Sequence, residues 1–188
     1  MNIIERAKNI LLNPKYEWEI IKDEAGTIQD LFTKYALFLA AIPAVAGWIG
    51  YSFSAWVTVG SSFGWAVMTY ILSLAGVFIV GYIIDAFSTT FGSTKDLTAS
   101  MKVSVYSSTA SWVGGIFNIF HFLSFISLIA GIYTLVLMYY GLKIVKNVPE
   151  DKTTGYFITV VVVSIVVYLI IGGITSAMFL TGYAVTGF

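Results

Sequence analysis

Cysteine is absent from the 188 residues of this chain, and histidine occurs once. The lack of cysteine excludes disulfides and thiolate-bound metals, and a single histidine excludes histidine-rich metal clusters. We therefore expect neither a metal nor a cofactor. Charge is scarce as well, because Asp, Glu, Lys and Arg make up 11% of the chain, against about 25% in a soluble domain. Nothing charged follows Lys152. Such a composition is typical of a membrane protein.

Hydrophobic residues are abundant instead, at 58% of the chain with a mean hydropathy of +0.87. One stretch without charge covers forty residues, from Val103 to Leu142, and lies between Lys102 and Lys143. As one helix it would extend about 60 Å, twice the roughly 30 Å of a bilayer's hydrocarbon core. It therefore predicts a hairpin of two membrane-spanning helices with both ends on the same side.

Three further stretches have the length and composition of membrane spans. They cover about Tyr35–Trp56, Phe63–Asp85 and Tyr156–Phe179, and Pro43 is expected to kink the first. The predicted fold is all-α: a polytopic membrane protein of five transmembrane helices, preceded by short amphipathic helices. The transmembrane domain should occupy residues 35–180, with a short outside tail at 181–188.

Residues 1–34 predict an amphipathic helical cap. Apolar residues of the first helix share one face, opposite the charged side chains of Glu5, Arg6 and Lys8; the apolar set is Ile3, Ile4, Ala7, Ile10 and Leu11. A second helix from Pro14 should turn Trp18 toward the membrane. Such a segment usually lies flat at the bilayer interface, and docking of a partner protein is the alternative.

The positively charged residues predict the orientation. With five spans, all ten Lys and Arg residues lie on one side, in residues 1–34 and in the connections carrying Lys95, Lys102, Lys143, Lys146 and Lys152. The short turns and the tail on the other side carry none. By the positive-inside rule, the N-terminus is cytoplasmic and the C-terminus lies outside.

Several short motifs appear in order along the chain: Asn-Pro-Lys-Tyr-Glu-Trp at 13–18, Leu-Ala-Ala-Ile-Pro at 39–43, Tyr-Ser-Ser-Thr-Ala at 106–110, and Gly-Ile-Tyr at 131–133 followed by Tyr-Tyr-Gly at 139–141. In these motifs the chain resembles the Yip-domain family of five-span membrane proteins, and most closely its bacterial inner-membrane branch. The resemblance implies a five-span fold and location in the cell inner membrane. The chain lacks the Asp-Leu-Tyr-Gly-Pro signature of eukaryotic trafficking members.

Small residues at helical spacing predict close helix packing in the membrane. The candidate packing positions are Ala36, Ala40, Ala44, Gly115, Gly131, Gly172 and Gly173. Those outside the hairpin offer faces on which two copies of the chain could associate. A homodimer is therefore expected, and the alternative is that the same faces pack within one chain.

Asp85 is the only charged residue inside a predicted span, and ionisable groups in that position are usually functional. The densest set of hydroxyl groups starts the third span on the same side of the membrane: Tyr106, Ser107, Ser108, Thr109 and Ser111. We hypothesise that these residues form a ligand or proton site open to the cytoplasm. In the alternative interpretation Asp85 is an interfacial carboxylate near Lys95 or Lys102, and the hydroxyls bond to their own helix.

No arrangement of residues resembles a catalytic set, so we do not expect an enzyme. The basic residues are scattered, which argues against nucleic-acid binding. Two hypotheses for the function remain. The first is a scaffold or interaction protein of the cytoplasmic membrane, whose partners are the lipid bilayer, a second copy of the chain or other membrane proteins. The second is a small oligomeric transporter or channel with a polar site around Asp85.

Overall fold

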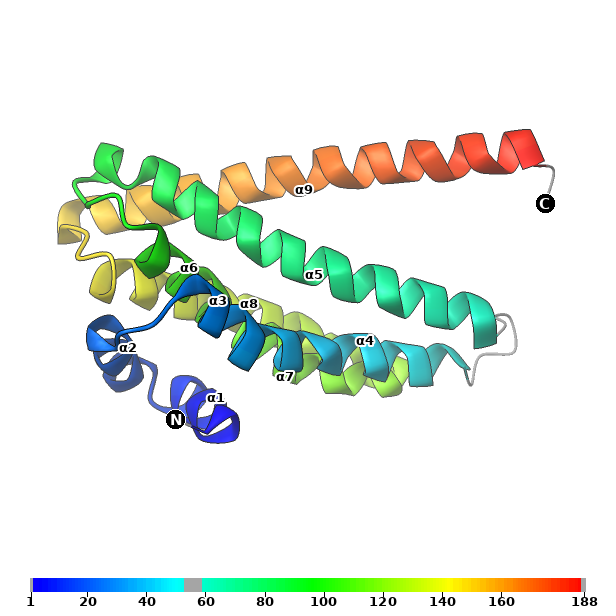
Figure 1. The fold of residues 1–188 in the computed structure, drawn as a ribbon, viewed down its shortest axis with the longest axis horizontal. Coiled ribbons are helices and arrows are strands. Elements are labelled where there is room, and N and C mark those ends of the chain that lie inside the picture. The colour runs from blue at the N-terminus through cyan, green and yellow to red at the C-terminus, as the bar shows by residue number, and fades with distance from the viewer. Residues whose placement is uncertain (1, 53–58, 187–188) are drawn as a thin grey trace.

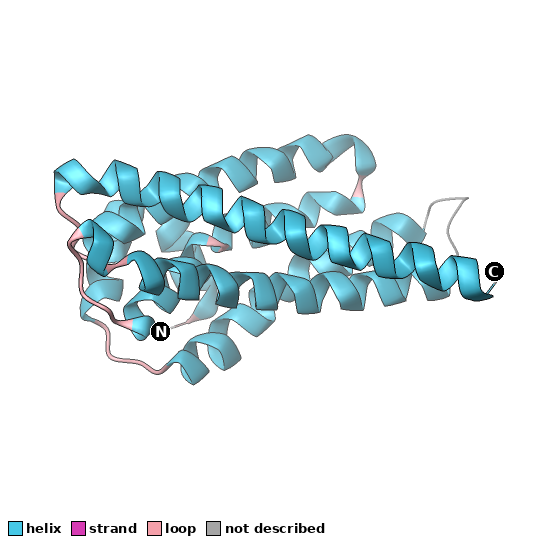
Figure 2. Ribbon diagram, turned by 90° about the horizontal axis from the view of Figure 1, so that it is seen from above, coloured by secondary structure: helices cyan, strands magenta, loops and turns pink. Residues whose placement is uncertain are grey.

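The structure is a computed structural model that describes residues 2–52 and 59–186, with 59–62, 121 and 171–186 described by their backbone alone. The described residues are almost all helical and contain no strand. Figure 1 shows long helices running along one axis, with two short N-terminal helices beside them. The view from above in Figure 2 shows the described chain as helices joined by short loops. The all-α prediction is confirmed.

The cap consists of α1 (Ile3–Leu12) and α2 (Pro14–Asp23). The Asn2 side chain caps α1 by accepting a hydrogen bond from the Ile4 amide, and Pro14 opens α2. Trp18, which we expected to turn toward the membrane, is fully buried against the bundle, where its ring lies edge-on to Tyr106. The predicted faces of α1 are partly wrong, because Arg6 is 3% exposed and Ile4 is 74% exposed. Arg6 is buried because it shares a helix row with Ile3 and Ile10, at spacings of three and four residues.

The first span begins earlier than Tyr35. It consists of α3 (Ile28–Leu31), a π-helical turn η1 (Phe32–Ala36) and α4 (Leu37–Ser52), which continues through Pro43. Thr27 starts the first turn: its hydroxyl accepts from the Asp30 amide at 3.0 Å and donates to the Asp30 carboxylate at 2.8 Å. Thr27 therefore caps the helix. In a capping box the carboxylate of the third helical residue would accept from the backbone amide of the cap residue, whereas here the Asp30 carboxylate accepts from the Thr27 hydroxyl.

The second and last spans lie in two long antiparallel helices, α5 (Val59–Phe87) and α9 (Glu150–Thr186). Near one end, Tyr156 contacts Ser88, and twelve residues farther along each helix Tyr168 lies beside Gly76. Beyond this region the two helices separate (Figure 1). A short 3-10 turn, η2 (Thr89–Phe91), follows α5.

The uncharged stretch from Val103 to Leu142 forms the predicted hairpin. Its return arm is one helix, α8 (Ser124–Ile144), reached through the short turn η4 (His121–Leu123). Its first arm is divided into three pieces, α6 (Leu97–Ser107), α7 (Thr109–Gly114) and η3 (Gly115–Ile119). Gly115 lies where the third piece packs against Pro43, and a Cβ added there would be 2.4 Å from the proline Cβ.

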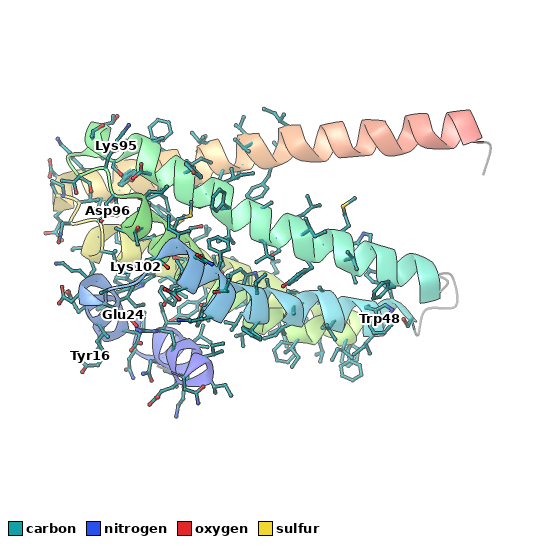
Figure 3. The ribbon with its side chains drawn as sticks, in the orientation of Figure 1. Tyr16, Glu24, Trp48, Lys95, Asp96 and Lys102 are labelled. Carbon is teal, nitrogen blue, oxygen red and sulfur yellow. The ribbon has the colours of Figure 1, made fainter. Side chains whose placement is uncertain are left out.

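Four helices in the described chain are long and apolar enough to cross a membrane: Ile28–Ser52, Phe63–Phe87, Ser124–Ile144 and Glu150–Ile170. The fifth predicted span is the divided arm of the hairpin, which is why it is not among these four. Figure 3 shows Lys95, Asp96 and Lys102 at one end of the bundle and Trp48 at the other. We call the end that carries the lysines the charged end.

The alanine row on the first span is a seam within one chain. Ala36 and Ala40 are fully buried and Ala44 is 5% exposed, because α4 packs against α5, α7 and η3. A dimer of the kind we expected cannot use this row without unpacking it. Gly131 has open space where a Cβ would be. Gly172 and Gly173 lie in α9, and their surroundings are outside the described residues.

Candidate functional site

A buried ion pair within the cap lies against the membrane helices. Arg6 donates from Nη1 to Oε1 of Glu17 at 2.6 Å and from Nη2 to the Glu24 carboxylate. Its guanidinium carbon lies 5.4 Å from the centre of the Tyr106 ring, within the range of a cation–π interaction. Glu17 is fully buried and comes from α2, whereas Tyr106 comes from α6. We call Arg6, Glu17, Glu24 and Tyr106 the Arg6 cluster.

Tyr35 and Thr109 extend the Arg6 cluster into the bundle. The Tyr35 ring lies edge-on to Tyr106 with centroids 4.8 Å apart, and its hydroxyl is 2.8 Å from the Thr109 hydroxyl. Tyr35 belongs to the π-helical turn, a local widening of the helix that is frequent at functional sites. The first and third spans thus meet the cap through neighbouring polar groups.

Lys102 holds the end of the second cap helix. Its ammonium donates to the carbonyls of Ile21, at 2.9 Å, and of Glu24. The last carbonyls of a helix lack partners within the helix and carry its partial negative charge, so a lysine there stabilises the helix end. Burial lowers the pKa of Lys102, while the nearby Glu24 carboxylate opposes that shift.

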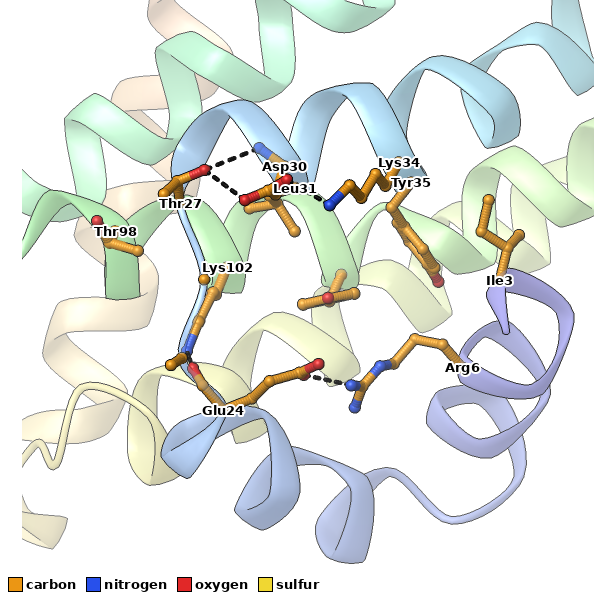
Figure 4. Close-up of a pocket in the computed structure, with 13 residues that line it drawn as sticks. Ile3, Arg6, Glu24, Thr27, Asp30, Leu31, Lys34, Tyr35, Thr98 and Lys102 are labelled. Atoms are coloured by element: carbon orange, nitrogen blue, oxygen red, sulfur yellow. Dashed lines mark hydrogen bonds and ion pairs between the residues drawn. The ribbon is translucent and has the colours of Figure 1, made fainter. Parts of the chain in front are cut away.

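A hollow of about 270 Å³ lies where the cap, the first span and α6 meet. Figure 4 shows Arg6 and Glu24 facing each other across it, with Lys102 and Tyr35 on its walls. The charges around the hollow are already engaged: Arg6 with Glu24, and Lys34 with Asp30 at 2.6 Å. At this hollow the cap is fastened to the bundle by Lys102, through its bonds to the carbonyls of Ile21 and Glu24.

Asp85 lies at the charged end and is paired. Its carboxylate accepts a hydrogen bond from the Ser100 hydroxyl at 3.3 Å and is 3.9 Å from the ammonium of Lys146. The Lys146 side chain is 1% exposed, and it also donates to the carbonyls of Thr94 and Asp96. Burial lowers the Lys146 pKa, and the Asp85 carboxylate acts in the opposite direction. The partner of Asp85 is thus Lys146, where the interfacial interpretation named Lys95 or Lys102.

The structure separates the hydroxyl groups that the sequence hypothesis brought together. Tyr106 and Thr109 face the cap and the first span. Ser107, Ser108 and Ser111 line a cavity on the other side of the same arm. Among the described contacts, neither set is a partner of Asp85, which interacts with Ser100 about two to three turns nearer the charged end. The six candidate residues therefore occupy three places.

The sequence did not lead us to propose three of the site residues: Arg6, Glu17 and Lys146. A signal existed for the first two, since Arg6 follows Ile3 by three residues and Glu17 precedes Ile21 by four. A positive charge thus lies in the apolar row of α1 and a negative charge in that of α2. Lys146 gave no such signal, because it is one of several lysines near a predicted helix end.

Three comparisons with known proteins bear on these observations. A family model described as the Yip1 domain matches residues 8–172. The inner membrane protein YohC of Escherichia coli strain K12 is 22% identical over 183 residues, covering 91% of this chain and 94% of that protein. The protein of the same name from Escherichia coli O6:H1 strain CFT073 matches with the same values. No solved structure matches.

Proposed function

Because the chain belongs to the Yip1 domain family, a family of membrane proteins, we propose that it is a non-enzymatic scaffold of the inner membrane. In this proposal the cap is a rigid platform at the cytoplasmic surface, on which another membrane protein or a second copy of the chain docks. The observation that carries the proposal is the attachment of the cap to the bundle through buried polar contacts.

The attachment of the cap is distributed over both of its helices. The Arg6 cluster joins α1, α2 and α6, and Lys102 binds the end of α2. Tyr133 of α8 donates to the carbonyl of Leu11 at 2.8 Å, at the end of α1. A surface that is already ordered loses less conformational entropy when a partner binds, so this platform is suited to docking.

The outer face of the cap carries large apolar side chains. Ile4 is 74% exposed, Leu12 67% and Tyr16 71%, and Tyr16 projects away from the bundle in Figure 3. Aliphatic and aromatic side chains held on a rigid support are common anchors of protein interfaces. Lipid headgroups are the competing occupant of this face, and the experiment below separates the two.

The surroundings of Asp85 favour a scaffold over the second hypothesis, a transporter. Its carboxylate is occupied by Lys146 and Ser100 at the charged end, and the hydroxyls that would complete a polar site lie elsewhere. We expect liposomes containing the purified protein to show no solute flux above that of empty liposomes. Flux that Asp85→Asn abolishes would support the transporter instead.

A photoreactive amino acid tests the docking face directly. Benzophenone-bearing residues are placed singly at Leu12 and at Tyr16, with a control at Phe38, which is 62% exposed on the first span. We expect discrete cross-links to protein from the two cap positions, and a homodimer band if the partner is a second copy. Lipid adducts alone from Leu12 and Tyr16, as from Phe38, would refute the platform.

A further inference from the structure

A cavity of about 550 Å³ lies between α5, α6, α7, α8 and α9. Along α8 it extends from Leu128 to Met138, which is about 15 Å of helix at 1.5 Å per residue. These residues lie in the interior of a helix long enough to cross a membrane, so the cavity is at the depth of the hydrocarbon. Its volume falls within the roughly 300–1,000 Å³ of small-molecule sites.

Several hydroxyl groups line the cavity, and most are bonded to helix carbonyls. Ser104 donates to the carbonyl of Val77, Ser108 donates to the carbonyl of Ser104, and Ser111 donates to that of Ser108. Such bonds are the usual arrangement of serine in a membrane helix. They leave the hydroxyl oxygens able to accept further hydrogen bonds from the cavity.

Two of the lining hydroxyls have no hydrogen-bond partner within the described residues. Ser107 of α6 is 2% exposed and Ser164 of α9 is 9% exposed, and both line the cavity. A buried hydroxyl without a partner costs free energy, and hydrocarbon supplies no water to satisfy it. A molecule in the cavity that carries a hydrogen-bonding group would relieve that cost at either serine.

The lining carries no charged residue. Besides the hydroxyls, its polar atoms include the indole nitrogen of Trp112, which donates to Ser73 at 2.9 Å. The remaining wall is mainly aliphatic, with Val77 and Leu135 among its residues. A carboxylate or phosphate placed here would have no counterion, so the cavity favours an uncharged molecule.

The cavity is accessible from the lipid side of the bundle. Three of its lining residues are more than half exposed: Leu128 at 69%, Ile132 at 57% and Ile165 at 52%. They come from α8 and α9, so the opening lies at the edge between these helices. A ligand can therefore enter sideways from the bilayer.

We propose that this cavity binds an uncharged, single-chain lipid that carries a hydroxyl group, such as a long-chain or isoprenoid alcohol. The hydroxyl pairs with Ser107 or Ser164, and the hydrocarbon chain lies against the aliphatic wall. The site rests on observations separate from the Arg6 cluster, so it stands or fails independently of the scaffold proposal.

The test uses the full chain in nanodiscs with a diazirine-bearing long-chain alcohol as the probe. We expect light to attach the probe to α8 and α9 residues of the cavity, and excess unlabelled alcohol to compete. A diazirine-bearing fatty acid at a pH where it is ionised should label these residues far less. Equal labelling by the two probes would overturn the assignment to an uncharged lipid.

Glycine substitutions provide a matched pair of variants. Gly131 lines the cavity and Gly64 lies on α5 outside it, and at both positions an added Cβ meets nothing within 4 Å. Gly131→Leu should reduce labelling to the level seen with excess competitor, and Gly64→Leu should leave it unchanged. Equal labelling of wild type and Gly131→Leu would show lipid around the bundle only, and would refute the site.

Removing the free hydroxyls is a second test, which does not depend on Gly131→Leu folding. Ser107→Ala and Ser164→Ala each delete an unpartnered group and fill no space. If either hydroxyl holds the ligand, its loss should weaken competition by the alcohol about 2- to 10-fold, the value of one hydrogen bond. Unchanged competition in the double variant would overturn the role of these serines.

Discussion

Arg6 and Glu17, eleven positions apart on two different helices, form an ion pair 2.6 Å long that is almost completely removed from solvent. Opposite charges in such a place are costly to desolvate, and each becomes more costly still without the other. Arg6 also binds Glu24 at the end of α2, and its contact with the Tyr106 ring links the pair to α6. The stability of the cap therefore depends on this pair.

Removing one member of the pair should destabilise the protein strongly. Arg6→Met leaves the Glu17 carboxylate buried without a counterion, and we expect a loss of about 3–5 kcal/mol. The double variant Arg6→Met/Glu17→Leu should recover much of that loss. Thermal unfolding in mild detergent measures both. As a control, Lys34→Met removes an exposed pair with Asp30 and should leave the melting temperature unchanged; a similar loss in all three variants would contradict the prediction.

Lys146 should hold the connection between α5 and α6 in place. Lys146→Met removes the bonds to the carbonyls of Thr94 and Asp96 and the ion pair with Asp85. We expect faster cleavage at Lys95 by a lysine-specific protease. Lys143→Met is the matched control three residues earlier, because the Lys143 side chain is 41% exposed and its ion pair is with the exposed Glu150. Equal cleavage of the two variants would count against the role of Lys146.

Two glycines of the hairpin should respond oppositely to alanine. At Gly115 the new Cβ would be 2.4 Å from the Cβ of Pro43, so Gly115→Ala should cost at least about 1–3 kcal/mol through overpacking. At Gly131 the space is open, and Gly131→Ala should be neutral or stabilising by up to about 1 kcal/mol through helix propensity. Chemical denaturation in detergent compares them, and an equal effect at both positions would refute this packing.

Orientation is open to a direct test in this cysteine-free chain. Single cysteines replace Thr94 and Asp151, which are exposed at the charged end, and Phe122, which is 75% exposed in the hairpin turn. With the charged end in the cytoplasm, an impermeant thiol reagent should label Phe122→Cys in intact cells and should reach the other two only after lysis. Thr153 is fully buried and would stay unlabelled on either side. Labelling of Thr94→Cys from outside would show that the predicted orientation is wrong.

Helix locations were accessible from the sequence because hydrophobic length determines them. The β-branched run Val160–Val167 is helical in α9, as its place in a long apolar stretch predicted. The divided arm was not predicted, because its interruption depends on where Gly115 meets Pro43, a contact between residues 72 positions apart. Small-residue spacing indicates that helices approach closely, and the identity of the partner comes from tertiary packing.

The candidate site was predicted less well, since neighbours in sequence were treated as neighbours in space. On a helix with 3.6 residues per turn, Ser104, Ser108 and Ser111 share one face while Tyr106 and Thr109 lie on the opposite one. That division could have been predicted from the sequence, and the structure shows the two sets on opposite sides of the arm. The pairing of Asp85 with Lys146 could not, because a distance of 61 residues separates them and other lysines were nearer.

The bond from Tyr133 to the carbonyl of Leu11 joins residues 122 positions apart, and Tyr106 and Lys102, which also hold the cap, belong to α6. A chain is synthesised from its N-terminus, so the two cap helices leave the ribosome long before the surface that receives them exists. Until the hairpin has been inserted, Arg6 and Glu17 have only each other and water. The two cap helices therefore reach their final positions only after the hairpin has been made.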